Sequence, residues 1–140
     1  MSDMIRQELF PGVWLRCIHT DKFKSAYLSV TLMTALSEKT AGLNALIPHV
    51  LRRGTRVHPD MESLSAALDE LYGGAIEPSV RKKGETQCVG FVASCIDDSF
   101  VPGGEKLLES VADLLGELIC DPATERGRSG LSLSIGASAL

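Results

Sequence analysis

The sequence lacks the short motifs on which several common function classes depend. Its four cysteines include no Cys-x-x-Cys pair, which weakens both a zinc ribbon and a redox dithiol. It has no Gly-x-Ser-x-Gly run for a nucleophilic serine, and neither of the glycine-rich runs that cradle phosphates. No apolar stretch approaches the roughly 18 residues needed to cross a bilayer. A catalytic triad, a nucleotide site and a membrane span therefore have no support.

Charge and composition limit the expected partners, the cellular location and the role of the cysteines. The 14 Lys and Arg residues against 18 Asp and Glu residues give a net charge of -4 with no basic block, which disfavours nucleic acid as a partner. The charged N-terminal residues 1–8 do not form a secretory signal, so a cytoplasmic location is expected. In that reducing compartment the cysteines are expected to be small buried hydrophobes: Cys17, Cys88, Cys95 and Cys120.

Four segments are predicted to be strands, 13–20 from its β-branched and aromatic residues, 25–33 from its alternation of apolar and polar residues, and 75–81 and 86–96 as strand-like runs. The segments 13–20 and 25–33 are joined by four residues, a spacing that favours an antiparallel hairpin. The segments 75–81 and 86–96 form a second predicted hairpin, in which Gly84 can supply a positive φ. Both faces of the segment 86–96 are fairly apolar, which is typical of a central strand.

Three apolar stripes have helical spacing, two of them between the predicted hairpins and one after the second hairpin. The first predicts a helix closed by Gly54, with a kink or a restart at Pro48. The second predicts a helix with Asp60 as its N-cap and an end at Gly73. The third is ended by Asp121-Pro122. The stripe residues are Leu43, Leu46, Ile47, Val50 and Leu51, then Leu64, Ala67, Leu68, Leu71 and Tyr72, then Leu107, Leu108, Val111, Leu114, Leu115, Leu118 and Ile119.

The element order β β α α β β α predicts an α+β fold in which an antiparallel-rich sheet packs against helices, and it disfavours a doubly wound parallel sheet. With 140 residues the chain has room for one domain, which we place at residues 1–122. The segment 123–140 is rich in glycine and serine and carries no charge after Arg128. We expect this tail to be disordered or a truncation artefact.

His49 is the residue that raises the question of function. A lone histidine on a helix is more often a hydrogen-bonding residue than a metal ligand, because a zinc site needs about three protein ligands. However, the run from Gly42 to Thr55, Gly-Leu-Asn-Ala-Leu-Ile-Pro-His-Val-Leu-Arg-Arg-Gly-Thr, resembles the zinc-binding helix of the pitrilysin/insulinase-like metallopeptidases, the inverzincins. Their His-x-x-Glu-His signature is followed by a Gly-Thr pair. The resemblance extends over about residues 8–122, and it implies the fold of the N-terminal part of a metallopeptidase-like domain.

The resemblance also implies that the signature is degenerate. The second signature histidine falls on His49, the catalytic glutamate on Pro48 and the first histidine on Ala45. Alanine cannot bind a metal and proline cannot act as a base, whereas the chemistry needs two imidazoles one turn apart with a carboxylate beside them. The stretch around Glu125 does not match the family's remaining ligand, so no role is transferred to it. We therefore expect no catalytic residue, no metal ligand set and no cofactor.

The resemblance points to a non-catalytic metallopeptidase-like domain that serves as a partner, or as a peptide-holding subunit, of an active peptidase. Self-association is an alternative form of that partnership. Two other hypotheses stay open. One is a zinc-dependent endopeptidase-family protein whose missing ligands come from elsewhere. The other is an inactive fragment, truncated or shifted in frame after about residue 125, which the uncharged tail favours.

Overall fold

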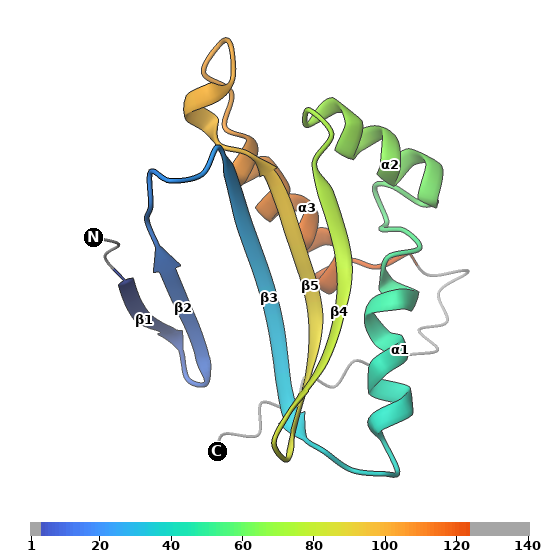
Figure 1. The fold of residues 1–140 in the computed structure, drawn as a ribbon. Helices are drawn as coiled ribbons and strands as arrows, with labels where there is room; N and C mark the ends of the chain where they lie inside the picture. Colours follow the sequence, from blue (N-terminus) through green and yellow to red (C-terminus); the bar gives the residue numbers. More distant parts are fainter. Residues whose placement is uncertain (1–3, 124–140) are drawn as a thin grey trace.

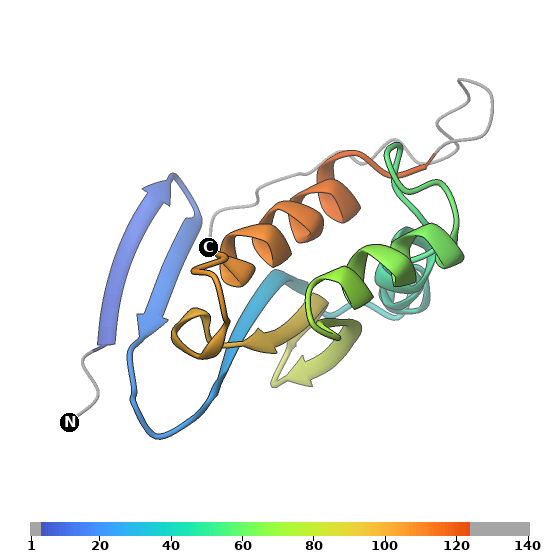
Figure 2. The same ribbon diagram turned by 90° about the horizontal axis from the view of Figure 1, so that it is seen from above.

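The computed structural model describes residues 4–123 and arranges its main sheet and helices in two layers. The sheet has the order β3-β5-β4, and three helices cover one of its faces, as Figures 1 and 2 show. A separate hairpin stands beyond β3. The elements are β1 (Met4–Phe10), β2 (Val13–Ile18), β3 (Ser25–Ala35), α1 (Ala41–Leu51), α2 (Met61–Glu70), β4 (Ala75–Lys83), β5 (Thr86–Ile96), a 3-10 turn (Asp98–Phe100) and α3 (Leu107–Cys120). The predicted α+β class is confirmed.

The central position of β5 is also confirmed. This strand pairs antiparallel with β3 on one side and with β4 on the other. Its residues Val89, Phe91, Ala93 and Cys95 are buried beneath the helices. The turn from β4 into β5 contains Gly84 at φ +60°, a backbone conformation that favours glycine. The second predicted hairpin is therefore correct, with β4 longer by two residues than expected.

The helices α2 and α3 follow most of their predicted patterns, but α2 ends at Glu70 and the predicted stripe residues Tyr72 and Leu108 are exposed. Asp60 caps α2, where its carboxylate accepts a hydrogen bond from the Ser63 backbone N–H at 2.7 Å. In return, the Ser63 hydroxyl oxygen accepts a hydrogen bond from the Asp60 backbone N–H. These bonds from Ser63 hold the pKa of Asp60 below its usual value. The inner faces of the two helices supply most of the core: Leu64 and Leu68 from α2, and Leu107, Val111, Leu114, Leu115 and Leu118 from α3.

The first predicted hairpin is wrong. The strand β2 pairs with β1, which the prediction did not include, and β3 pairs with β5. A tight turn with Gly12 at φ +79° joins β1 to β2. The strand β2 therefore pairs with the strand that precedes it in the sequence and not with the one that follows. The partner of β3 is instead chosen by the core, because Ala26, Leu28 and Val30 must pack on the same cluster as β5.

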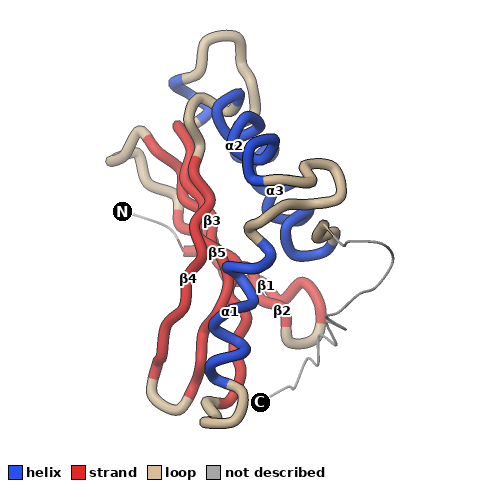
Figure 3. The backbone as a smooth tube through the Cα atoms, turned by 90° about the vertical axis from the view of Figure 1, so that its right-hand side faces the viewer, coloured by secondary structure: helices blue, strands red, loops and turns tan. Residues whose placement is uncertain are grey.

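The helix α1 departs from its prediction in two ways. It runs from Ala41 to Leu51 without restarting at Pro48, whose ring is fully buried so that packing offsets the missing hydrogen bond. Its predicted apolar stripe faces the core only at Ile47 and Leu51. The other three members of that stripe are exposed: Leu43, Leu46 and Val50. Figure 3 shows α1 alongside the sheet, where only one side of the helix can be covered.

The expectation of buried cysteines holds for one residue of the four. Cys95 is buried in the core, Cys88 is half-buried, and Cys17 and Cys120 are exposed. Burial, reinforced by the charges of Asp98 and Asp97, raises the pKa of the Cys95 thiol, which keeps it protonated at neutral pH. Cys17 lies on the thin hairpin and Cys120 ends α3, and neither place offers a core to enter.

Within residues 4–123 no helix is both long enough and apolar enough to span a membrane. The cytoplasmic location expected from the sequence stays a prediction. The domain boundary at residue 122 is likewise untested, and the predicted tail, apart from Ala123, lies outside the described residues.

Candidate degenerate metal site

The helix α1 is anchored to the sheet by a buried amide pair. The Asn44 side-chain amide donates to the side-chain oxygen Oε1 of Gln87 at 3.2 Å, and the side-chain Nε2 of Gln87 donates to the Ala41 backbone carbonyl at 2.8 Å. Gln87 is on β5 and is buried, so these bonds satisfy polar atoms that water cannot reach. They fix the rotation of α1 and therefore the direction in which its signature positions point.

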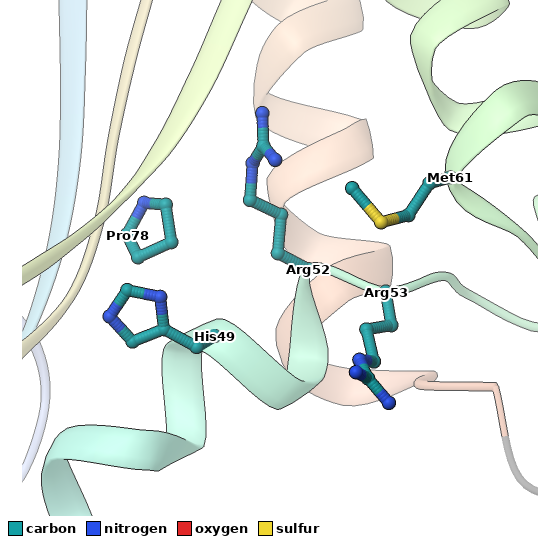
Figure 4. Close-up of a pocket in the computed structure, with 5 residues that line it drawn as sticks. All are labelled: His49, Arg52, Arg53, Met61 and Pro78. Carbon is teal, nitrogen blue, oxygen red and sulfur yellow. The ribbon is translucent and has the colours of Figure 1, made fainter.

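The three signature positions lie on one side of α1. Ala45 is half-buried, Pro48 is fully buried, and His49 is exposed beside Pro78 of β4, as Figure 4 shows. Only His49 can donate a lone pair to a metal. Among the described residues no three His, Cys, Asp or Glu side chains are close enough together to hold a metal ion. Glu125, to which no role was transferred, lies outside that range.

These residues do not fit a zinc ion. Zinc in proteins takes about four ligands, three of them from the protein in catalytic sites. The structure offers one imidazole here, next to a methyl group and a pyrrolidine ring. A hydrolytic step through a metal-bound water therefore cannot be built from this helix.

The Gly54-Thr55 pair connects α1 to α2 and packs this connection against α3. Thr55 is fully buried, and its hydroxyl donates to the Glu117 carboxylate of α3 at 3.2 Å. The same hydroxyl accepts the His58 N–H at 2.9 Å, and the His58 ring lies 3.1 Å from that Glu117 oxygen. A Cβ added at Gly54 would lie 2.7 Å from the Pro59 carbonyl carbon. Only glycine fits there, so the pair holds the connection between α1 and α2 against α3.

The C-terminal end of α3 is tied to this connection as well. The Arg56 guanidinium lies 2.9 Å from the Asp121 carboxylate, and the Arg56 N–H donates to the Asp121 carbonyl at 3.0 Å. Sequence reasoning singled out neither His58 nor Glu117, which are 59 residues apart. The sequence indicated this contact only through the Gly54-Thr55 pair, which is part of the family resemblance but does not by itself predict a contact with Glu117.

A small pocket opens at the C-terminal end of α1. Its volume is about 260 Å³, and it is lined by His49, Arg52, Arg53, Met61 and Pro78. The Arg52 Nε donates to the Ile76 carbonyl of β4 at 2.9 Å. In Figure 4 the guanidinium of Arg52 extends toward β4, whereas that of Arg53 extends away from it. His49 therefore lines a pocket together with an arginine whose direction is fixed.

The chain is similar to known proteins over most of its length. No protein-family model matches the chain. It is 35% identical over 114 residues to a Bacillus subtilis (strain 168) protein named "Probable inactive metalloprotease YmfF", a match that covers 81% of this chain and 27% of that protein. It superposes with a TM-score of 0.83 and 27% identity on a conserved protein from Enterococcus faecalis V583, over 89% of this chain and 29% of that one. The chain thus spans less than a third of either relative.

Proposed function

We propose that this chain is a catalytically silent metallopeptidase-like domain. The observation that carries the proposal is the composition of one face of α1, where Ala45 and Pro48 accompany His49. The similarity to a protein whose name describes an inactive metalloprotease supports it. We further propose that residues 1–122 correspond to the N-terminal portion of a domain of the pitrilysin/insulinase-like type, on the resemblance of the Gly42–Thr55 run.

Metal analysis tests this proposal. The purified chain is expected to hold no stoichiometric zinc and to leave fluorescently labelled casein uncleaved, because one imidazole lacks the ligand count of a tight site. Any residual zinc measured by elemental analysis should be unchanged in His49→Ala. One zinc per chain that disappears in this variant would overturn the proposal.

A repaired signature provides the matching control. The double variant Ala45→His and Pro48→Glu should still fail to cleave casein, because no further ligand is present among the described residues. Circular dichroism must accompany the assay, since position 48 is buried and a carboxylate there has to be desolvated. A folded double variant that cleaves casein would show that the missing ligands come from elsewhere.

We also propose that the domain acts through a protein partner, namely a metallopeptidase of the same fold with an intact signature. Two exposed apolar surfaces support this. One is the outer stripe of α1, formed by Leu43, Leu46 and Val50, and the other is the hairpin β1-β2, whose side chains are all exposed. In addition, each of the outer strands β3 and β4 pairs on one side only within residues 4–123, and a free strand edge is a template for pairing.

Light scattering of the chain mixed with such a peptidase should show a complex larger than either component. Leu46→Glu should abolish that complex, because it places a charge in the centre of the outer stripe of α1. Leu108→Glu, at a partly exposed leucine of α3, is the control and should leave the complex intact. A clean monomer at high concentration, together with no complex in the mixture, would contradict the partner role.

A further inference from the structure

The pocket at the end of α1 carries positive charge that no described residue neutralises. Within residues 4–123, neither Arg52 nor Arg53 lies within 4.0 Å of a carboxylate, whereas Arg56, three positions further on, pairs with Asp121 at 2.9 Å. The neighbouring Asp60 carboxylate is engaged by the N–H of Ser63. The pocket therefore has an unmatched preference for an anion.

Arg52 is held in a defined direction. It is half-buried, and its Nε–H donates to the Ile76 carbonyl at 2.9 Å. Basic side chains at the C-terminal end of a helix commonly offset the partial negative charge of its free carbonyls. That effect explains a cation at this position, and the bond to Ile76 directs the guanidinium beyond the end of α1 toward β4, as Figure 4 shows. Within residues 4–123 the terminal nitrogens of Arg52 make no hydrogen bond, so these donors of the planar guanidinium can bind a carboxylate.

The walls and size of the pocket restrict the ligand. Pro78 and Met61 provide apolar walls, and His49 provides a second hydrogen-bonding group beside Pro78. A volume of about 260 Å³ is below the usual range for a drug-sized ligand, so it fits one side chain or one chain end. An anionic head with a short apolar part matches these features.

We propose that this pocket binds the carboxylate of a peptide, with Arg52 as the principal anchor. The peptide as the source of the carboxylate rests on the proposed function, whereas the anion preference rests on the charges of the pocket alone. The retained histidine of the degenerate signature then has a use that needs no metal. It lines the same pocket as the anchoring arginine in place of ligating zinc.

Isothermal titration calorimetry on the full chain tests the proposal with three probes: N-acetyl-trialanine, its C-terminal amide, and sodium phosphate. The acid is expected to bind with a millimolar Kd. The amide should bind at least about ten-fold more weakly, as the loss of one charge-assisted hydrogen bond predicts. Equal binding of acid and amide, or no binding of the acid, would overturn the proposal. Binding of phosphate without binding of the acid would overturn the peptide as the source.

Three variants locate the site. Arg52→Gln should weaken binding of the acid at least about ten-fold, and a thermal melt shows whether the lost bond to Ile76 has also disturbed the fold. His49→Glu, at an exposed position, places a competing carboxylate beside Arg52 and should have the same effect without unfolding. Arg81→Gln is the matched control, because Arg81 also belongs to β4 but lies three positions from Pro78, on the opposite face of the strand, and is exposed. It should change the affinity by less than about two-fold, which is within the range of a distant surface charge. Equal losses in all three variants would refute the assignment. Zinc analysis tests the proposed function separately, so carboxylate binding in this pocket and the proposed function can fail independently.

Discussion

Gly90→Ala is expected to destabilise the protein by at least about 3 kcal/mol, the upper end of what overpacking usually costs. Gly90 lies in β5, directly opposite Thr31 of β3. A Cβ at this position would overlap the carbonyl oxygen of Val30 and lie 2.9 Å from its carbonyl carbon. Because the obstacle is backbone, a rotamer change cannot relieve it, and β3 must move away from β5. Urea unfolding followed by circular dichroism measures the loss.

Gly116→Ala is the matched control for that variant. Gly116 lies inside α3, and a Cβ there would meet nothing within 4 Å. The substitution should raise the free energy of unfolding by about 0.5 to 1 kcal/mol, because alanine has the higher helix propensity. If Gly90→Ala were as stable as the wild type, the close approach of β3 and β5 at this point would be wrong.

Leu118→Ala is expected to lower the free energy of unfolding by about 2 to 5 kcal/mol, the range for a leucine removed from a closed core. Leu118 is completely buried and belongs to the cluster that α3 forms with the sheet. The variant loses the transfer free energy of the removed carbons, and it also leaves a cavity that rigid neighbours cannot close. The urea midpoint should fall while the slope of the transition stays unchanged.

The same substitution on the same helix provides the comparison. Leu108 is 39% exposed, so Leu108→Ala should cost less than about 1 kcal/mol, as surface substitutions generally do. The pair therefore separates burial from helix propensity, because both variants replace leucine by alanine in α3. Equal losses in the two variants would contradict the orientation of α3 against the sheet.

The elements with strong local signals could be predicted from the sequence. The two apolar faces of the segment 86–96 predicted the central position of β5, because a strand with two apolar faces is usually covered on both sides within a sheet. Gly84 and Asp60 marked a turn and a cap, whose chemistry depends on neighbouring residues only. The heptad-like spacing in α3 also led directly to its core residues.

Predictions that required knowledge of a partner surface were the ones that went wrong. The pairing of β2 with β1 rather than β3 depends on which strands the core recruits, and two neighbouring strand signals cannot reveal that. The outer leucines of α1 have the spacing of a core stripe, yet α1 lies on the sheet with Ile47, Pro48 and Leu51 inward. Apolar periodicity predicts that a helix has an apolar face. Which side of the helix is buried depends on how the helix packs on the sheet.

The sequence by itself determined that Ala45 and Pro48 can supply neither a metal ligand nor a base beside His49, since their side chains have no lone pair or acid to offer whatever the fold. Only the tertiary structure decided what surrounds the retained His49. It brought Arg52 against the Ile76 carbonyl of β4, and it joined Thr55 and His58 to Glu117 of α3. Those contacts link residues 24 to 62 positions apart. Chemical identity is a property of single residues, whereas a pocket or a joint exists only where the fold places distant residues within hydrogen-bonding distance.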